Sequence, residues 1–254
     1  MERVPKSLKY ELMVVLAMNE QIDERSKVLQ LFDRAKIEED IIDNLTLKDI
    51  DLSFTDLSQL FADRIFANGI NFRATSFIGA SFRDCEFMSA NFESCNFEQT
   101  DIADCVLSKA NFSKSQMRKA EIKISTCIES NFDDVDLSSG NLSGTTMLNA
   151  YFRRANLRGI AAQEVNFDHS DMSGANISEG NFENSDFINA KLTNVDATNA
   201  KFVGVNFSGA DFTNGNFKNA DFSNSNLDDV IWKGAIVEGA IFDESVRDEI
   251  LKKV

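Results

Sequence analysis

Large hydrophobic residues recur at every fifth position through most of this chain. The phase begins at Phe72 and continues without an insertion to Phe242. Of the 35 positions in that phase, 18 are Phe, and most of the others are Leu, Ile, Met, Val or Trp. A period of five fits neither an amphipathic helix, which repeats every 3.6 residues, nor a simple strand, which repeats every two. The chain is therefore predicted to be a repeat protein.

The residues two places before each large one are mostly small. Examples are Ala80, Cys85, Ala90, Cys95, Thr100, Cys105, Ala110, Ala175, Gly180, Ser185 and Ala190. Residues two apart in an extended segment point the same way, so each unit directs one small and one large side chain inward. The other three positions are rich in Asn, Asp, Ser, Thr and Gly, which favour turns. A chain that turns a corner every five residues must coil.

This pattern resembles that of the pentapeptide-repeat family, in which a small residue, Asn or Asp, Leu or Phe, and two polar residues follow one another. The sequences Ala-Asn-Phe-Glu-Ser at 90–94 and Ala-Asp-Phe-Thr-Asn at 210–214 match it. The resemblance covers residues 42–242 and implies an all-β solenoid, a right-handed quadrilateral β-helix with four pentapeptides in each coil. About ten coils, stacked at the strand spacing of about 4.8 Å, would form a rod roughly 48 Å long.

The pattern is irregular between Leu57 and Phe72. There the large position holds alanine, the small position holds leucine or isoleucine, and two phenylalanines lie one residue out of phase. These residues are Leu60, Phe61, Ala62, Ile65, Phe66, Ala67 and Ile70. We expect either a bulge or a swapped packing of small and large side chains in this stretch.

Helical patterns flank the repeat domain at residues 42–242. Residues 1–41 contain two apolar stripes with helical spacing, so we predict two helices over residues 6–41. The stripes are Leu8, Leu12, Val15 and Leu16, and Val28, Leu31, Phe32 and Ala35. This N-terminal segment either caps the open end of the solenoid or binds a partner.

Residues 243–254 are predicted to form a short C-terminal helix, because Ser245 and Asp248 resemble a capping box that precedes an apolar face. A helix of this length is not stable alone, so it either caps the last coil or contacts a second copy of the chain. A C-terminal helix joins two rods end to end in some pentapeptide-repeat proteins, and the resemblance therefore implies a homodimer. The residues expected at this contact are Trp232, Val246, Ile250, Leu251 and Val254.

The sequence offers little support for catalysis or for a bound cofactor. Cys85, Cys95 and Cys105 occupy the small position and Cys127 the large one, so all four are expected to be buried, with Cys85 and Cys105 stacked one coil apart. The single histidine, His169, is expected at an outward turn. No nucleophile motif, phosphate-binding loop or metal-ligand spacing is present. We predict a protein that is not an enzyme and that holds no metal or cofactor.

The formal net charge of −15 narrows the choice of partners. It disfavours direct binding to nucleic acid or to anionic membranes and favours a basic protein. No apolar run reaches the length of a membrane span, and no secretory signal pattern is evident, so a cytoplasmic location is expected.

A period of twenty assigns each residue to one of four faces, which we name after Phe82 (first face), Phe87 (second), Phe92 (third) and Phe97 (fourth). Between residues 42 and 242 the net charges of these faces are −5, −5, 0 and −2. The first two faces should therefore form an acidic edge along the rod, to which a protein partner would bind. The candidate residues are Asp84, Glu86, Asp101, Asp104, Glu129, Glu164, Asp168, Glu183 and Asp186.

Two functions are compatible with this edge. The first is a non-enzymatic protein-binding rod or scaffold. The alternative follows from the resemblance, because some fluoroquinolone-resistance members of the family mimic DNA and bind type II topoisomerases. The partner would then be DNA gyrase or topoisomerase IV, and binding would modulate the inhibition of that enzyme. The charge density of the rod is lower than that of DNA, which weighs against the alternative. About 48 Å of duplex DNA carries roughly 28 negative charges, whereas the repeat domain has a net charge of −12.

Overall fold

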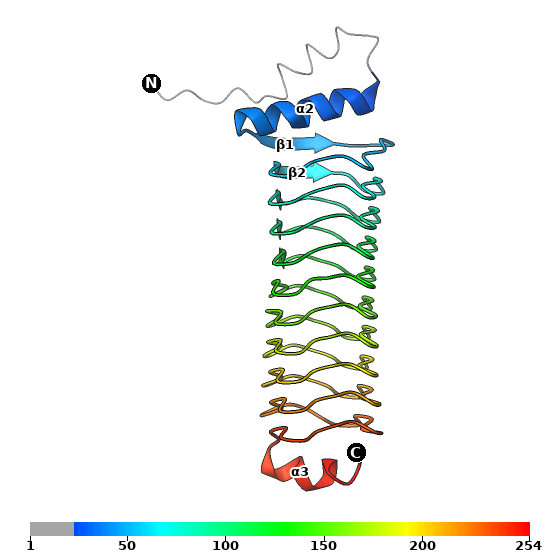
Figure 1. Cartoon of the computed structure of the whole chain (residues 1–254), viewed down its shortest axis with the longest axis vertical. Helices are drawn as coiled ribbons and strands as arrows, with labels where there is room; N and C mark the ends of the chain where they lie inside the picture. The colour runs from blue at the N-terminus through cyan, green and yellow to red at the C-terminus, as the bar shows by residue number, and fades with distance from the viewer. Residues whose placement is uncertain (1–22) are drawn as a thin grey trace, which may run out of the picture.

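The computed structural model describes residues 23–254 and shows a rod of stacked coils with a helix at each end (Figure 1). Helix α2 (Glu24–Glu38) lies across the N-terminal end, and helix α3 (Glu244–Ile250) lies at the C-terminal end. The more N-terminal of the two predicted helices falls outside the described residues. Five strands form one parallel sheet in chain order. They are β1 (Ile41–Thr46), β2 (Phe61–Phe66), β3 (Ser81–Arg83), β4 (Asp101–Ala103) and β5 (Glu121–Lys123).

Backbone pairing repeats at intervals of twenty residues along the whole rod. Ile41 pairs with Phe61, and the same register continues through strands and isolated bridges to the pair Asp221 and Ile241, which makes ten successive steps. Within one coil the bridges recur every five residues, so four bridges connect each coil to the next. The predicted solenoid with four pentapeptides per coil is confirmed.

A left-handed backbone conformation ends every five-residue unit. All 41 residues at intervals of five from Glu39 to Gly239 have positive φ, and nine of them are glycine. Asn, Asp and Gly tolerate this conformation best. The polar composition of the outward positions therefore follows from the turn that each corner requires.

The irregular stretch between Leu57 and Phe72 keeps the register of the other coils. Leu60 and Ile65 are buried in the small position, Ala62 fills the large position, and Phe61 points outward. The positive φ values stay in phase at Arg64 and Gly69. Of the two expected outcomes, the structure therefore has swapped packing and no bulge.

Helix α2 covers the first coil with both apolar and basic side chains. Its residues Leu31, Phe32 and Ala35 are buried in the continuous core of the rod. Arg25 Nε donates to the carbonyl oxygen of Asp51, and Lys36 Nζ donates to that of Asp56, each at 2.8 Å. Within residues 23–254 no coil precedes these carbonyl groups, so the basic side chains supply donors that a neighbouring coil would otherwise provide.

The four cysteines are buried, as the repeat predicted. The amide of Cys85 donates to Sγ of Cys105 at 3.3 Å, which confirms that these two residues stack one coil apart. Burial raises the pKa of the Cys95 thiol to about 12. The Cys95 thiol is therefore protonated at neutral pH, and it donates to the carbonyl oxygen of Phe72 at 2.9 Å.

Candidate functional site

The nine acidic residues predicted to form an edge lie on two adjacent faces, but they do not form one continuous surface. One bridge column of the second face runs from Glu86 through Val106, Thr126, Thr146 and Asn166 to Asp186. Four acidic residues lie near its first end and four near its second, with uncharged residues between them. The N-terminal acidic group comprises Asp84, Glu86, Asp101 and Asp104, and the C-terminal acidic group comprises Glu164, Asp168, Glu183 and Asp186. Glu129 lies apart from both, at the far corner of the second face.

Most of these carboxylates lack a basic partner among the residues that the structure describes. Asp101 contacts Lys123 and Glu129 contacts Lys109, each at 3.7 Å. The other seven form no ion pair with any residue in the described range 23–254. Their charge is thus left to act on the solvent or on a partner.

The third face has a net charge of zero, and four of its six basic residues form ion pairs with acids on neighbouring coils. Arg153 forms hydrogen bonds from Nε to both carboxylate oxygens of Asp133, at 3.1 and 3.0 Å. The ion pairs of this face are Arg73–Glu93, Lys114–Glu93, Arg153–Asp133 and Arg154–Asp134. Ion pairs also occur on the first and second faces, but acids outnumber bases there, so most of the candidate carboxylates remain without a pair among residues 23–254.

The C-terminal acidic group contains the clearest electrostatic strain among the predicted residues. Partial burial, together with the nearby negative charge of Asp168, raises the pKa of the Asp186 carboxyl above its ordinary value of 3.8. Asp168 is held in place because its Oδ1 accepts a hydrogen bond from the Ile188 amide at 2.8 Å. A cationic side chain placed between these two carboxylates would relieve their repulsion. His169 is exposed at a left-handed turn beside this group, as expected.

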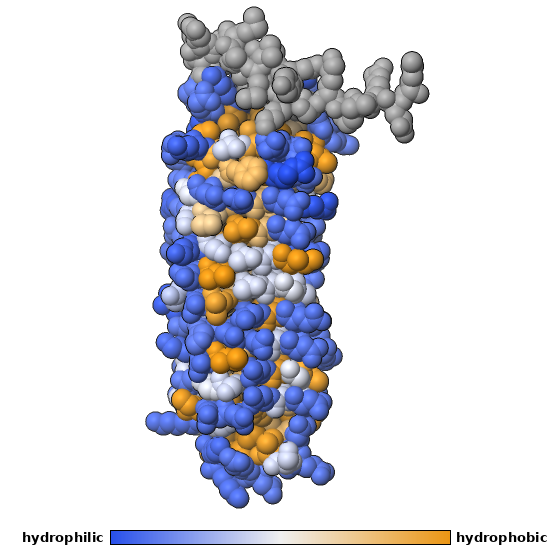
Figure 2. Space-filling model, turned by 180° about the vertical axis from the view of Figure 1, so that it is seen from behind, coloured by the Kyte–Doolittle hydropathy of each residue, from blue (hydrophilic) through white to orange (hydrophobic). Residues whose placement is uncertain are grey.

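Exposed apolar side chains are the feature that sequence reasoning missed. Phe54 and Ile124 are 70% and 68% exposed, although both occupy the left-handed turn position where polar residues prevail. Figure 2 shows one face of the rod, on which hydrophobic side chains gather near both ends and in small groups between hydrophilic ones. The signal was present in the sequence, since a large apolar residue at the fifth position of a repeat departs from the pattern.

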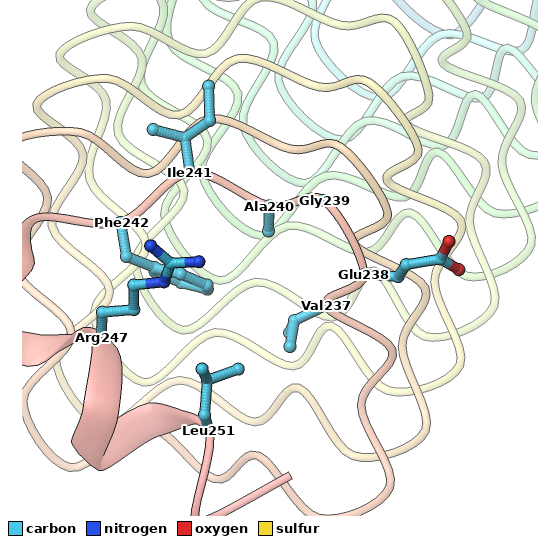
Figure 3. Close-up of a pocket in the computed structure, with 8 residues that line it drawn as sticks. All are labelled: Val237, Glu238, Gly239, Ala240, Ile241, Phe242, Arg247 and Leu251. Atoms are coloured by element: carbon cyan, nitrogen blue, oxygen red, sulfur yellow. The ribbon is translucent and has the colours of Figure 1, made fainter.

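The C-terminal end brings together the residues predicted for a dimer contact, but with unequal exposure. Trp232 and Ile250 are only 2% and 4% exposed, because they pack within the chain, and Val246 is half-buried. Leu251 and Val254 are 49% and 43% exposed. Figure 3 shows Leu251 on the C-terminal side of α3 pointing toward Val237 of the last coil, across a hollow of about 550 Å³.

The described part of the chain contains neither a metal site nor a membrane-spanning helix. Within residues 23–254, no group of His, Cys, Asp and Glu side chains is arranged to hold a metal ion. None of the helices in this range has the length and apolar character needed to cross a membrane.

Comparison with known proteins identifies the repeat. The pentapeptide-repeat family model matches in eight copies, spanning residues 68–121 and 130–243. The fold is similar to that of HetL, a pentapeptide repeat protein involved in heterocyst differentiation regulation in the cyanobacterium Nostoc sp. strain PCC 7120. The two sequences are 19% identical, and the match has a TM-score of 0.47 and covers 85% of this chain and 93% of HetL. A trypsin-treated form of QnrB1, a plasmid-mediated fluoroquinolone resistance protein, shows 15% identity and a TM-score of 0.41 over 84% of this chain and 95% of its own. No curated protein sequence matches the chain.

Proposed function

Because this chain belongs to the pentapeptide-repeat family, we propose that it is a protein-binding rod without catalytic activity. Its first and second faces bind a partner that presents basic residues. One observation carries the proposal: seven of the nine candidate carboxylates on these faces have no ion pair within the described residues, whereas the third face neutralises several of its basic side chains internally. Unpaired charge of one sign on one side of a rigid body attracts and orients a partner of the opposite sign.

The rigidity of the rod supports binding by these faces. Ladder hydrogen bonds connect every coil to its neighbours from Ile41 to Ile241. The outward carboxylates are therefore held at fixed spacings before a partner arrives, and association costs little ordering of the rod itself. The fixed spacing of the carboxylates raises the affinity of such a scaffold for its partner and requires no catalytic group.

A type II topoisomerase, DNA gyrase or topoisomerase IV, is the alternative partner, which the acidic faces would approach as a mimic of DNA. The gap between the two acidic groups weighs against it. Asp104 and Glu164 are three coils apart, or about 14 Å at the usual strand spacing, and duplex DNA of that length carries roughly eight charges. A basic protein that contacts two separate acidic groups fits the charge pattern better than a surface shaped for continuous phosphates.

Charge-neutral variants test the proposed function. In the test variant, Asp84, Asp101 and Asp104 become Asn and Glu86 becomes Gln. A matched control removes the same number of charges from the fourth face through Glu98→Gln, Asp136→Asn, Glu179→Gln and Asp196→Asn. Proteins captured from a cell extract by the immobilised rod are quantified by mass spectrometry at several salt concentrations. We expect at least one protein to be lost by the test variant and by high salt but retained by the control.

Equal capture by the test variant and the control would overturn the proposed function. The topoisomerase alternative is tested separately by adding each purified rod to a gyrase supercoiling reaction. Inhibition by the wild type and by the control, but not by the test variant, would favour the alternative partner. The absence of any effect at micromolar concentration would eliminate gyrase.

A further inference from the structure

Ile124 is an anomaly in the turn chemistry of the rod. Of the 41 left-handed turn positions, it is the only one that holds a β-branched residue, with a φ of 52°. A β-branched side chain strains this conformation, because its two Cβ substituents crowd the backbone. The side chain is also 68% exposed, so core packing does not explain its presence. A residue that breaks a local rule without a structural gain points to a role at the surface.

Toward the C-terminal end of the rod, Ile124 has uncharged neighbours, and two outward residues of the adjoining face are apolar. On the second face, Ile128 and Leu148 point outward from consecutive coils and are half-buried. Between them and the corner run Thr126 and Thr146, which pair across the coils. Gly144 lies beside Ile124, since a Cβ atom at Gly144 would be 3.8 Å from Ile124 Cγ1. We call Ile124, Ile128 and Leu148 the central apolar patch.

The central apolar patch fills the gap between the two acidic groups. One corner column of the rod reads, from coil to coil, Asp84, Asp104, Ile124, Gly144 and Glu164. Residues 137–152 contain no charged side chain. Lys123, the nearest basic residue, is occupied by ion pairs with Asp101 and Glu121. The surface thus alternates acidic, apolar and acidic along the rod axis.

The backbone at the patch leaves no free edge for an added strand. The amide of Ile122 donates to Asn141 O at 2.7 Å, and that of Thr146 donates to Ser125 O at 3.0 Å. A partner must therefore be held by its side chains. An α-helix laid along the rod meets this requirement, because it presents apolar residues at i, i+3 or i+4, and i+7 on one face.

Taking the proposed function as its basis, we infer that the central apolar patch and the acidic groups on either side of it bind an amphipathic helix that is apolar at its centre and basic at both ends. Asp104 and Glu164 lie about 14 Å apart at the strand spacing. A helix rises 1.5 Å per residue, so its flanking Lys or Arg residues should be roughly ten positions apart. Ile124 is the apolar anchor of the contact, and the carboxylates set its orientation.

A displayed library of random 18-residue peptides tests the inference without requiring the identity of the natural partner. Selection is made on the wild-type rod alone, and the selected clones are then compared for binding to an Ile124→Asn variant. Asn is favoured in the left-handed conformation, so this substitution removes the anchor and should raise the denaturant midpoint rather than lower it. Ser94→Asn is the matched control, because Ser94 is an exposed left-handed turn residue on the diagonally opposite corner. Selected peptides are synthesised, and their dissociation constants are measured by fluorescence anisotropy.

We expect peptides with a central apolar face and basic ends to bind the wild type and the Ser94→Asn control equally, and to bind the Ile124→Asn variant about tenfold or more weakly. Failure to select any peptide that loses affinity with Ile124→Asn would overturn the inference. If the selected peptides are basic and depend on Asp104 and Glu164 but not on Ile124, the proposed function stands and the helix inference fails. If they bind without dependence on the acidic groups, both fail.

Discussion

The rings of Phe112 and Phe132 stack 4.8 Å apart, with their planes 4° from parallel. Phe152 extends the same column at 4.9 Å, and Phe92 and Phe72 continue it toward the N-terminus at 4.9 and 5.2 Å. The spacing equals that between paired strands, so the ladder of backbone hydrogen bonds brings identical rings into register. Phe92, Phe112 and Phe132 are each buried between two other rings in the third face of the rod. The column therefore links the stability of each coil to that of its neighbours.

Phe132→Ala should lower the free energy of unfolding by about 3–5 kcal/mol, because it leaves a cavity between two rings and removes a fully buried side chain. The measurement is urea unfolding followed by circular dichroism. Phe54→Ala is the control, since Phe54 is 70% exposed and its ring lies under the guanidinium of Arg73 in a cation–π interaction. Phe54→Ala should lower the free energy of unfolding by less than about 1 kcal/mol. Equal losses for the two variants would show that the stacked column is not a major source of stability.

The two ion pairs Asp133–Arg153 and Asp134–Arg154 should differ in value although they are consecutive in sequence. The Asp133 side chain is 10% exposed and also accepts a hydrogen bond from the Arg153 amide at 2.9 Å. Asp133→Ala should therefore cost about 1–3 kcal/mol, because the part-buried Arg153 amide loses its acceptor and the Arg153 side chain loses its ion pair. Asp134 and Arg154 are 38% and 61% exposed, and Asp134→Ala should cost less than about 1 kcal/mol. Thermal unfolding of the two variants in parallel checks the difference, and equal shifts would contradict it.

The features that repeat were predictable from the sequence, whereas those that depend on one location were not. The phenylalanine phase indicated which side chains are inward, and even the swapped coil at Ala62 kept its register. A period of twenty also places Arg153 beside Asp133, so that ion pair could have been found by counting. The hydrogen bonds that Arg25 and Lys36 donate to the first coil could not have been found in this way, because they depend on the direction in which α2 crosses that coil. The gap in the acidic edge, by contrast, could have been found by counting, because residues 137–152 contain no charged side chain.

Asp186 and Asp134 should respond to pH in opposite directions. The pKa of Asp186 is raised above 3.8 by burial and by Asp168, so the folded state binds more protons than the unfolded state. Stability then falls as pH rises from 3.8 through the raised pKa. Asp186→Asn should therefore stabilise the rod at pH 7, by less than about 1 kcal/mol for a largely solvated group, and this gain should vanish at about pH 3, below the ordinary value.

The pKa of Asp134 is lowered by its hydrogen bond and ion pair with Arg154. Its contribution is complete above pH 3.8 and is lost as the pH falls through the lowered pKa. Asp134→Asn should therefore destabilise the rod at pH 7 and have less effect in acid. Melting temperatures of the wild type and both variants between pH 3 and pH 7 test the two signs together. Parallel curves for the two variants would refute the assignment.

The last coil leaves a strand edge without a neighbour. One coil earlier, the amides of Phe212, Asn214 and Phe217 donate to carbonyl groups of the last coil. The corresponding amides of Trp232, Gly234 and Val237 have no protein acceptor in the range 23–254. Helix α3 covers only part of this end, and the side chains of Ile236, Ile241 and Leu251 remain about half exposed. An unpaired edge beside apolar side chains favours association of two copies.

The double substitution Leu251→Glu and Val254→Glu should therefore convert a dimer to a monomer while leaving Trp232 covered by α3. Removal of the whole helix would be a poorer test, since it would expose the buried Trp232, which lies beside Val246 and Ile250. Ile37→Glu at the opposite end of the rod is the control, because Ile37 is 82% exposed and lies far from α3. Light scattering on the purified proteins gives their masses. We expect the control to keep the wild-type mass and the double variant to have half of it. A wild type that is already monomeric would refute the dimer and would leave α3 with a capping role alone.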